Sequence, residues 1–345
     1  MPGGERDAIL PRMTRFSLLD LARVRAGDGP VEALAQCRAQ AVLAERLGFH
    51  RYWIAEHHGM EGVASAATAV VLAHVGNATS TIRIGAGGIM LPNHPPLVVA
   101  EQFGTLHALF GDRIDLGLGR APGSDGRTAM ALRRDLSGPD RMPADVIELQ
   151  GLLAGDPGQG VIAVPGAGTN VPLWILGSSL YGARLAALLG LPYAFASHFA
   201  PAALHEALGL YRAEFRPSAQ LAEPYAAAAF NVWAADSREE AALLASSVEQ
   251  SFVQLATGRP GKLPPPVPGY RDSLPGQAQA LLARALACSV AGTVDDVRDG
   301  VRGFVASTGV DEVIVSTAIF DLAAQARSLE LTAEALCDLP LARAA

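Results

Sequence analysis

Three ionisable residues in a row, Glu56, His57 and His58, follow the apolar run Tyr52–Ala55. Burying all three at a strand end would be costly, and imidazole is the side chain that titrates near neutral pH. We therefore expect at least one of them to line a binding site. Because side chains alternate along a strand, His57 is expected to point away from Glu56 and His58, so the three would not act as one cluster. A solvated strand end without chemistry is the alternative interpretation.

Glycine-rich segments end two further predicted strands. Gly85, Gly87 and Gly88 interrupt an apolar run, and the segment Gly117–Gly119 precedes Arg120. Glycine inside a strand contributes no side-chain packing, which indicates that a flat ligand or another backbone approaches closely. Arg120 is expected at the rim of the same mouth.

A third segment, Gly177–Gly182, places Ser178 and Ser179 at a predicted helix start. Free backbone N–H groups and hydroxyls at such a position suit a phosphate, although serine caps are common and the pattern alone is not specific. Together the three segments and His57 predict a mouth with a wall for a flat ligand, a phosphate seat and a titratable histidine.

Short β-rich runs alternate with longer stretches at helical spacing, which is typical of repeated βα units. The predicted strands are Phe16–Leu21, Arg51–Ala55, Ile82–Met90, Ile114–Gly119, Leu173–Gly177, Tyr193–Ser197, Ala228–Ala234 and Glu312–Ser316. The predicted helices are Pro30–Arg46, Ser65–Ala78, Pro96–Phe110, Ala144–Leu153, Tyr181–Leu189, Pro201–Phe215, Ser237–Leu255 and Leu322–Leu336. Eight such units predict an α/β fold of the (β/α)8 TIM-barrel type. An open doubly wound sheet is the alternative, but no G-x-G-x-x-G turn follows the first strand.

Two stretches interrupt the alternation. Gly155–Asn170 is rich in glycine and proline and is predicted to form an extra hairpin. Ala256–Ser273 contains three consecutive prolines and is long enough to form an insertion or lid between strands 7 and 8, with a plain surface excursion as the alternative. We expect residues 1–13 to be a disordered extension and residues 14–340 to form one barrel domain.

Composition excludes several classes of protein. The 345 residues are 50% hydrophobic and carry a net charge of −7, which argues against disorder and against nucleic-acid or anionic-membrane partners. Three widely spaced cysteines and the absence of a His-x-His pair predict neither disulfides nor a metal site. With no apolar run of about 18 residues and no signal peptide, a cytoplasmic protein is expected.

Four runs in the same order resemble the bacterial luciferase-like flavin monooxygenases, in their non-luminescent, single-chain-type branch. They are Glu56-His57-His58, IGAGGIMLPNHPP, RIDLGLGRAPGSD and PLWILGSSLYGARLAALLGLPYAFASHFAP. The resemblance implies a barrel that binds reduced FMN delivered by a separate flavin reductase. The reduced flavin would react with O2 to a C4a-hydroperoxide that oxygenates a small substrate such as an aldehyde.

Carried over residue by residue, the resemblance makes His57 the catalytic acid/base and Gly87-Gly88 a non-proline cis peptide beneath the flavin. Arg120 and the segment Ser178–Gly182 fall at the FMN phosphate, and His198 falls against the isoalloxazine. The implied cofactor-binding set is Glu56, Ala86, Gly87, Gly88, Arg120, Gly177, Ser178, Ser179, Leu180, Tyr181, Gly182 and His198.

The sequence also departs from the luciferases. Gly119 stands where luciferase has a reactive cysteine, and Ser178 replaces the acid of the phosphate segment, so light emission is not predicted. An F420-dependent hydride-transfer oxidoreductase and a non-catalytic flavin-binding protein are the alternatives on the same fold. F420 has an acidic tail that calls for several cations, and only Arg120 and Arg127 are obvious near the mouth. The resemblance further implies a homodimer. It would form through a small-residue face of Ala66, Ala67, Ala69 and Ala73, with packing of that face on the barrel as the equal alternative.

Overall fold

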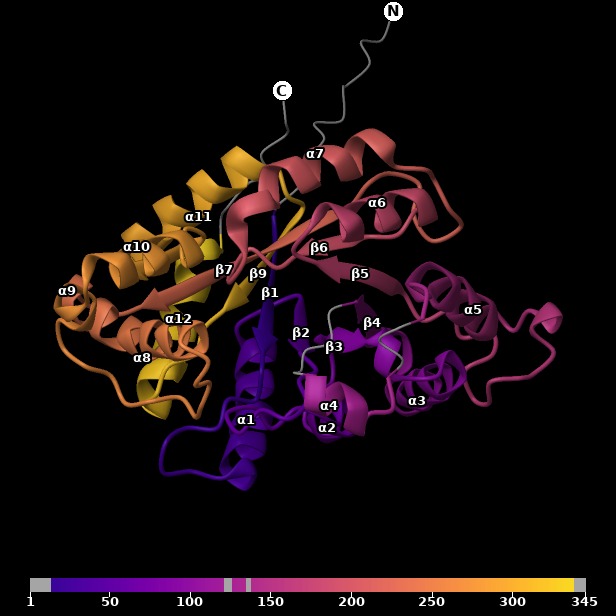
Figure 1. Ribbon diagram of the computed structural model, residues 1–345, viewed down its shortest axis with the longest axis horizontal. Helices are drawn as coiled ribbons and strands as arrows, with labels where there is room; N and C mark the ends of the chain where they lie inside the picture. The colour runs from indigo at the N-terminus through magenta and orange to yellow at the C-terminus, as the bar shows by residue number, and fades with distance from the viewer. Residues whose placement is uncertain (1–13, 121–125, 135–137, 338–345) are drawn as a thin grey trace, which may run out of the picture.

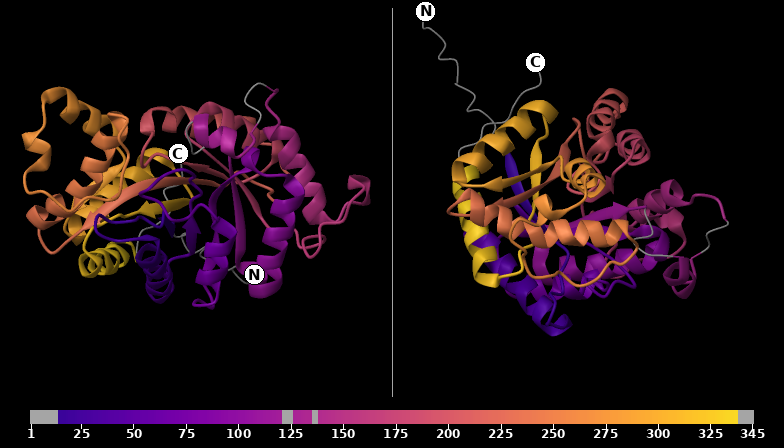
Figure 2. Two further views of the ribbon diagram at one scale, coloured as in Figure 1. Left: turned by 60° about the horizontal axis from the view of Figure 1, so that its bottom comes forward. Right: turned by 60° about the vertical axis from the view of Figure 1, so that its left-hand side comes forward.

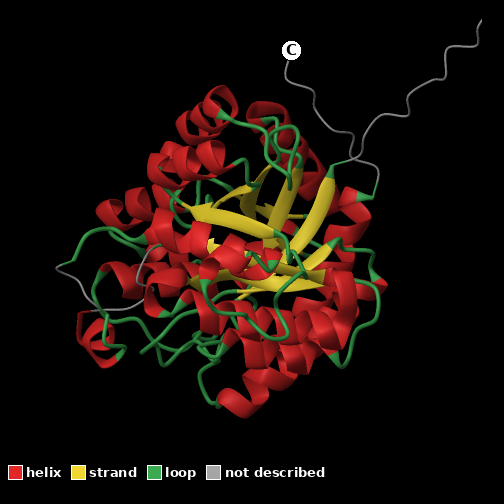
Figure 3. Ribbon diagram, turned by 90° about the vertical axis from the view of Figure 1, so that its right-hand side faces the viewer, coloured by secondary structure: helices red, strands yellow, loops and turns green. Residues whose placement is uncertain are grey.

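The computed structural model describes residues 14–120, 126–134 and 138–337, and the predicted extension 1–13 lies outside these residues. Within them, eight parallel strands form a closed ring (Figures 1 and 3). These are β1 (Arg15–Asp20), β2 (Arg51–Ile54), β3 (Arg83–Met90), β4 (Ile114–Gly119), β5 (Leu173–Gly177), β6 (Tyr193–Phe195), β7 (Ala226–Ala234) and β9 (Glu312–Ser316). Each strand pairs with the next, β6 pairs with β7, β7 with β9, and β9 with β1 closes the ring. The predicted (β/α)8 barrel is confirmed.

Helices surround the ring (Figure 3). They are α1 (Pro30–Arg46), α2 (Thr68–Gly76), α3 (Pro96–Phe110), α4 (Gly126–Ala131), α5 (Met142–Ala154), α6 (Leu180–Leu189), α7 (Leu204–Glu214), α11 (Val294–Thr308) and α12 (Leu322–Leu336). Short 3-10 helices span Leu91–Asn93, Gly111–Arg113, Pro157–Gln159 and Pro201–Ala203. Among the described residues, none of the helices has the length and apolar character needed to cross a membrane.

The predicted insertion lies between β7 and the last barrel strand. It contains α8 (Arg238–Ala256), α9 (Tyr270–Ser273), α10 (Gly276–Ala285) and β8 (Ser289–Gly292), which adds to the C-terminal half of β7. Figure 2 shows these helices, in orange, gathered on one side of the barrel. Sequence patterning missed α10, α11 and β8, although Thr293 and Asp296 form a capping box at the start of α11.

The segment Gly155–Asn170 is not a hairpin. It forms a 3-10 helix and turns without any strand pairing, and Gly155, Gly160 and Gly168 all have positive φ. Closely spaced left-handed glycines reverse the chain too often for two extended strands to form between them. The prediction for this segment was therefore wrong.

The insertion is fastened to the loop that follows β1. Leu263 is buried, its N–H donates to the Val24 carbonyl (2.8 Å), and its own carbonyl accepts from the Ala26 N–H (2.8 Å). The Lys262 ammonium donates to the Asp28 carbonyl (2.7 Å). Gly62 lies so close that a Cβ there would come within 2.1 Å of the Gly261 carbonyl oxygen. The predicted lid is thus packed on the barrel mouth rather than extended from it.

An ionic network fills the opposite, N-terminal end of the barrel. The Arg51 guanidinium, at the start of β2, donates to Glu312 of β9 (2.8 Å) and to Asp115 of β4 (2.7 Å). Arg83 of β3 donates to Asp115 (2.6 Å), and the Tyr225 hydroxyl donates to Glu312 (2.8 Å). Both carboxylates are completely buried. Four strands of the ring are therefore joined through buried charge.

The network sets the protonation of its acids. Burial raises the pKa values of Asp115 and Glu312, but the Arg51 guanidinium, together with Arg83 at Asp115 and the Ser17 hydroxyl at Glu312, holds both below their ordinary values. The stabilisation is therefore present above about pH 4, the ordinary carboxyl pKa, and is lost as the pH falls through the lowered values.

Replacing Arg51 with Met should destabilise the fold by about 3–5 kcal/mol, because two buried carboxylates lose their shared cation. Urea unfolding monitored by circular dichroism measures the loss at pH 7, and the difference from wild type should shrink below about pH 4. The matched control is Arg298→Met, which removes an exposed pair with Asp295 and should cost less than about 1 kcal/mol. Equal, small losses in the two variants would contradict the structural role given to Arg51.

Candidate functional site

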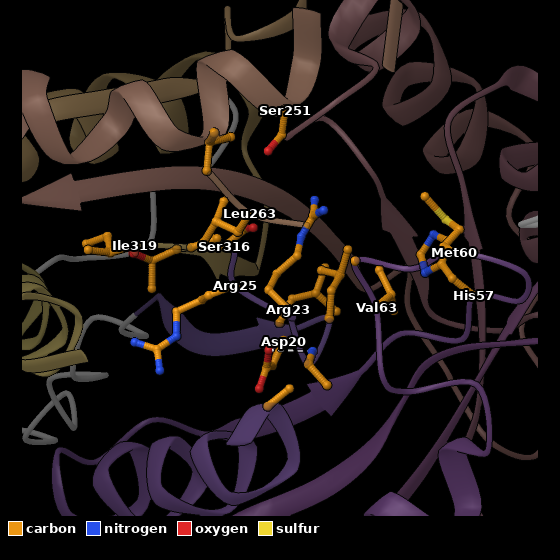
Figure 4. A pocket seen from close by; sticks show the side chains of 18 of the residues that line it. Asp20, Arg23, Arg25, His57, Met60, Val63, Ser251, Leu263, Ser316 and Ile319 are labelled. Atoms are coloured by element: carbon orange, nitrogen blue, oxygen red, sulfur yellow. Dashed lines mark hydrogen bonds between the residues drawn. The ribbon is translucent and has the colours of Figure 1, made fainter. Parts of the chain in front are cut away.

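A cavity of about 600 Å³ opens at the C-terminal ends of the strands, beneath the insertion (Figure 4). It is lined by the loops after β1, β2, β6 and β9, by α8 and by the Pro260–Leu263 segment of the insertion. Its volume lies in the range of small-molecule sites, roughly 300–1,000 Å³. His57, Met60, Arg23, Ser251, Leu263 and Ile319 are among the side chains that face it.

His57 lies in the loop after β2 and lines the cavity. Its Nδ1 atom is buried and has no hydrogen-bond partner among the described residues. Burial, followed by the nearby Arg23 guanidinium, lowers the pKa of His57 to about 4. Near neutral pH His57 therefore presents an uncharged imidazole with an uncommitted ring nitrogen.

His198, after β6, reaches the same cavity. Burial, with Arg23 and His57 acting in the same direction, lowers its pKa to about 3. Its Nδ1 is also buried without a partner among the described residues, while its main-chain carbonyl accepts from the Asn231 amide of β7 (2.6 Å). The structure thus brings His57 and His198, far apart in the sequence, into one cavity as two uncharged imidazoles.

Glu56 belongs to a separate cluster with His58 and His94. Its Oε1 atom lies 2.7 Å from His58 Nε2 and 2.8 Å from His94 Nε2, and its Oε2 accepts from the Met90 N–H (3.2 Å). Burial would raise the pKa of Glu56, but the two imidazoles hold it below its ordinary value. His57 is absent from this cluster, as strand alternation predicted.

The same three side chains have the donor types of a metal site, with ligand atoms within 4.8 Å of one another. However, one carboxylate oxygen already bonds both imidazoles. The arrangement therefore has a sufficient explanation as a hydrogen-bonded cluster that fixes the chain between β2 and the turn after β3.

The glycines of β3 and β4 are explained by close backbone contact. A Cβ at Gly85, Gly88 or Gly117 would lie 2.3–2.6 Å from a carbonyl oxygen of the neighbouring strand. The Gly87-Gly88 peptide is cis, as the resemblance implied, and the Gly88 carbonyl accepts from the Glu56 N–H (3.3 Å). Ala86 is fully buried beside them. The sequence left two explanations for these glycines, a flat ligand or another backbone close by. At Gly85, Gly88 and Gly117 it is the backbone of the neighbouring strand.

The predicted phosphate segment lies where β5 passes into α6. Ser179 is the N-cap of α6, and its side chain makes no cap hydrogen bond. The Arg120 guanidinium, at the end of β4, sits 4.1 Å from the centre of the Tyr181 ring and 3.4 Å from the Asp140 carboxylate. Burial and then Asp140 raise the pKa of Tyr181 to about 12. The structure therefore brings Arg120 to this segment, outside the residues that line the cavity of His57.

Sequence analysis missed Arg23, Asn231 and the loop after β1 as parts of the site. A signal was present, because Asp20, Arg23 and Arg25 are charged residues directly after an apolar strand. These residues were considered only for a glycine-rich turn, which they do not form, and not as part of a binding site. Arg134 was missed as well: its guanidinium donates to the Arg120 carbonyl (3.4 Å), so the mouth has more cations than the sequence suggested.

A parallel β/α barrel with a covered cavity at the C-terminal ends of its strands has the architecture of barrel enzymes, which bind their substrates at that end. The chain belongs to the luciferase-like monooxygenase family, a family of oxidoreductases, whose model matches residues 14–312. The resemblance seen in the four sequence runs is confirmed.

Individual relatives agree with this assignment. A luciferase-like monooxygenase of Escherichia coli K12 is 51% identical over 92% of this chain and 95% of its own length. An N-acetyl-S-alkylcysteine monooxygenase of Bacillus subtilis is 30% identical over 94% of this chain and 98% of its own. The structure of apo-MsnO8 superposes with a TM-score of 0.85 at 34% identity, covering 95% of this chain and 99% of that chain.

More distant structures share the fold alone. One is the oxygenating constituent of 3,6-diketocamphane monooxygenase from Pseudomonas putida in complex with FMN, with a TM-score of 0.72 at 16% identity, covering 96% of this chain and 100% of that chain. Another is an F420-dependent secondary alcohol dehydrogenase in complex with an F420-acetone adduct, with a TM-score of 0.69 at 16% identity, covering 94% and 100%.

We expect the His57 ring to titrate with a midpoint near pH 4 rather than near the ordinary value of about 6.5. His57 takes up a proton at higher pH in the unfolded chain than in the folded protein. It therefore lowers the stability of the fold as the pH falls from about 6.5 towards the folded-state pKa of about 4. NMR of the histidine ring protons, assigned with His57→Gln, measures the midpoint. A midpoint near 6.5 in the folded protein would show that His57 is open to bulk water.

Proposed function

We propose that this protein is a monooxygenase that uses reduced FMN and O2 to oxygenate a small organic substrate. The observation that carries the proposal is that the insertion covers the cavity in which His57 is held uncharged. Oxygen transfer from a reduced flavin needs protection from water, and a packed lid supplies it.

The residues present fit a flavin. Arg120, Ser178, Ser179 and the first turn of α6 would hold the phosphate, since they offer a guanidinium, hydroxyls and backbone N–H groups. His198 Nδ1 is a buried polar atom without a hydrogen-bond partner among the described residues, as expected where a polar ligand supplies one. Gly87-Gly88 and His198 would flank the ring.

Bound reduced flavin supplies two electrons and the site at which O2 is activated. One oxygen atom enters the substrate and the other leaves as water. His57 would hold or deliver the proton at its uncommitted Nδ1 atom, which its uncharged state near neutral pH allows. The relative that acts on N-acetyl-S-alkylcysteine supports a small thioether as substrate, and an aldehyde is the other class proposed.

We further propose that a separate reductase supplies the reduced FMN and that the protein is a homodimer. On and beside α2, Ala66, Ala67 and Val70 are exposed, whereas Ala69 and Ala73 pack against the barrel core. This exposed face supports a dimer contact. Light scattering should give twice the 35.8 kDa chain mass, and a monomer for Val70→Glu.

F420-dependent hydride transfer is the second candidate function. The observation in its favour is that Arg134 lies beside Arg120, with its Nη1 atom buried and unpartnered among the described residues. An acidic cofactor tail would use such a pair of cations. Binding titrations with FMN and with F420, followed by turnover under ¹⁸O2, separate the two functions. Label in the product supports the monooxygenase, and anaerobic hydride transfer supports the alternative.

His57→Ala should leave FMN affinity nearly unchanged and lower turnover by about 100-fold or more, because a positioned acid/base is lost. FMN fluorescence quenching gives the affinity, and product formation with FMNH2 and O2 gives the rate. Binding of flavin without turnover by the wild type, across aldehydes and thioethers, would instead indicate a non-catalytic flavin-binding protein. Unchanged turnover in the variant would contradict the role given to His57.

A further inference from the structure

Arg23 projects into the cavity from the loop after β1 (Figure 4). On one side, Arg23 forms an isolated antiparallel β-bridge with Val63, and the neighbouring Val24 N–H donates to the Gly62 carbonyl (3.0 Å). On the other side, the Val24 carbonyl accepts from the Leu263 N–H (2.8 Å). The position of Arg23 is therefore fixed by the loop after β2 and by the insertion. Its guanidinium lies with His57 and Met60 on one side and Ile319 on the other.

The Arg23 guanidinium has no hydrogen bond or ion pair within the part of the chain that the structure describes. Arg25, two residues further on, provides the contrast. It pairs with Asp28 (2.5 Å), donates to the Phe320 carbonyl (2.9 Å), and turns away from the centre of the cavity in Figure 4. The same short loop thus contains one paired arginine and one arginine directed into the cavity.

The acids of the cavity wall are committed elsewhere or exposed. Asp20 accepts from the Ala22 N–H (2.8 Å) and from the Tyr52 hydroxyl, so it attracts Arg23 only through space. Glu32 accepts from the Gly29 N–H (2.9 Å) at the start of α1, and Glu61 is exposed to solvent. His57 and His198 are uncharged near neutral pH. The cavity therefore has a half-buried cation without a partner anion among the described residues.

The remaining wall is mainly apolar. Its apolar lining includes Phe199, Phe252, Leu255 and Ile319, and α1 and α12 contribute glutamine side chains. An apolar cavity with one unpaired guanidinium suits a ligand that has an apolar body and a single anionic group. The phosphate of the proposed flavin has a cation of its own in Arg120, which is not among the residues of this cavity wall.

We propose that Arg23 binds a carboxylate of the substrate, so that this protein oxygenates small organic acids with an apolar remainder. The planar guanidinium matches the two oxygens of a carboxylate, and the enclosed position strengthens the pairing. The proposal rests on the monooxygenase function for the reaction, but the binding it predicts can be measured without turnover. Arg23 is accordingly a specificity-determining residue beside the acid/base His57.

A bound carboxylate would also act on His57. Burial and Arg23 lower the pKa of His57, His58 adds to this effect, and Glu56 opposes it. Neutralising Arg23 with a substrate anion removes one of the lowering effects, so the pKa of His57 should rise when the acid binds. Substrate charge would thereby prepare His57 to take up a proton.

The test is equilibrium binding to the FMN-loaded protein by calorimetry, with two matched pairs of probes. The pairs are N-acetyl-S-methylcysteine with its methyl ester, and 6-oxohexanoic acid with its methyl ester. At least one acid should bind about 10-fold or more tightly than its ester. Arg23→Met should remove that preference. It should lower the affinity for the acid at least 10-fold while changing the affinities for the ester and for FMN less than about 3-fold. Arg23→Lys should retain part of the preference.

Arg25→Met is the matched control, because it removes a cation of the same loop that is already paired, and it should preserve the preference for the acid. The His57 titration gives a second readout, which should move to higher pH in Arg23→Met. Equal affinity of each acid and its ester in the wild type, or no binding of either acid at 10 mM, would overturn the proposal. So would a loss of FMN affinity in Arg23→Met, which would place Arg23 against the flavin. Acid binding without oxygenation would support the carboxylate-binding role of Arg23 and contradict the monooxygenase function on which the reaction rests.

Discussion

The buried pairing of Arg51 with Asp115 and Glu312 is the constraint on which the barrel depends. The three residues come from β2, β4 and β9, so one guanidinium links strands that are not neighbours in the ring. A cation at this depth is tolerated only with well-aligned anions, and the anions are tolerated only with the cation. Slippage of any one of these strands by a residue would move its charge to the other face of the sheet, so the network also specifies strand register. Because the strands are parallel, fixing their beginnings fixes where they end.

The two ends of the barrel therefore have opposite electrostatic character. At the N-terminal end every buried charge has a partner, and the pKa values of the acids are held low. At the C-terminal end His57 and His198 remain uncharged and Arg23 has no partner among the described residues. Paired charge stabilises a fold, whereas unpaired polar groups lower stability and are expected where a ligand completes them. This difference between paired charges at one end and unpaired polar groups at the other distinguishes the end that stabilises the barrel from the end proposed to bind ligands.

Most of the barrel could be predicted from the sequence. β4, β5 and β9 have the predicted boundaries, because they are short apolar runs with clear breaks on either side. The helix α11 was missed because its apolar stripe is narrow and most of its other positions are Asp, Arg and Gly. The Arg51 network could not be predicted from the sequence, because its members lie far apart in the chain and only closure of the ring brings Glu312 to Arg51. Local pattern offers both His57 and Arg23 as candidates, because each is an ionisable residue after an apolar strand. That Arg23 is unpaired depends on its neighbours in the fold and could not be predicted.

The contacts that cover the cavity are the same contacts that place Arg23. The Val24 carbonyl accepts from Leu263 of the insertion, and its N–H donates to Gly62, where a side chain would collide with Gly261. If the insertion lifted, the loop after β1 would lose its two backbone bonds to Leu263, and the arginine it presents would be held only from the side of the loop after β2. Entry of a substrate and organisation of its binding group are therefore coupled through a few backbone hydrogen bonds. The insertion covers the cavity that His57 lines and also orders the cation nearby, so under the proposed function the covered state is the one in which binding and chemistry would coincide.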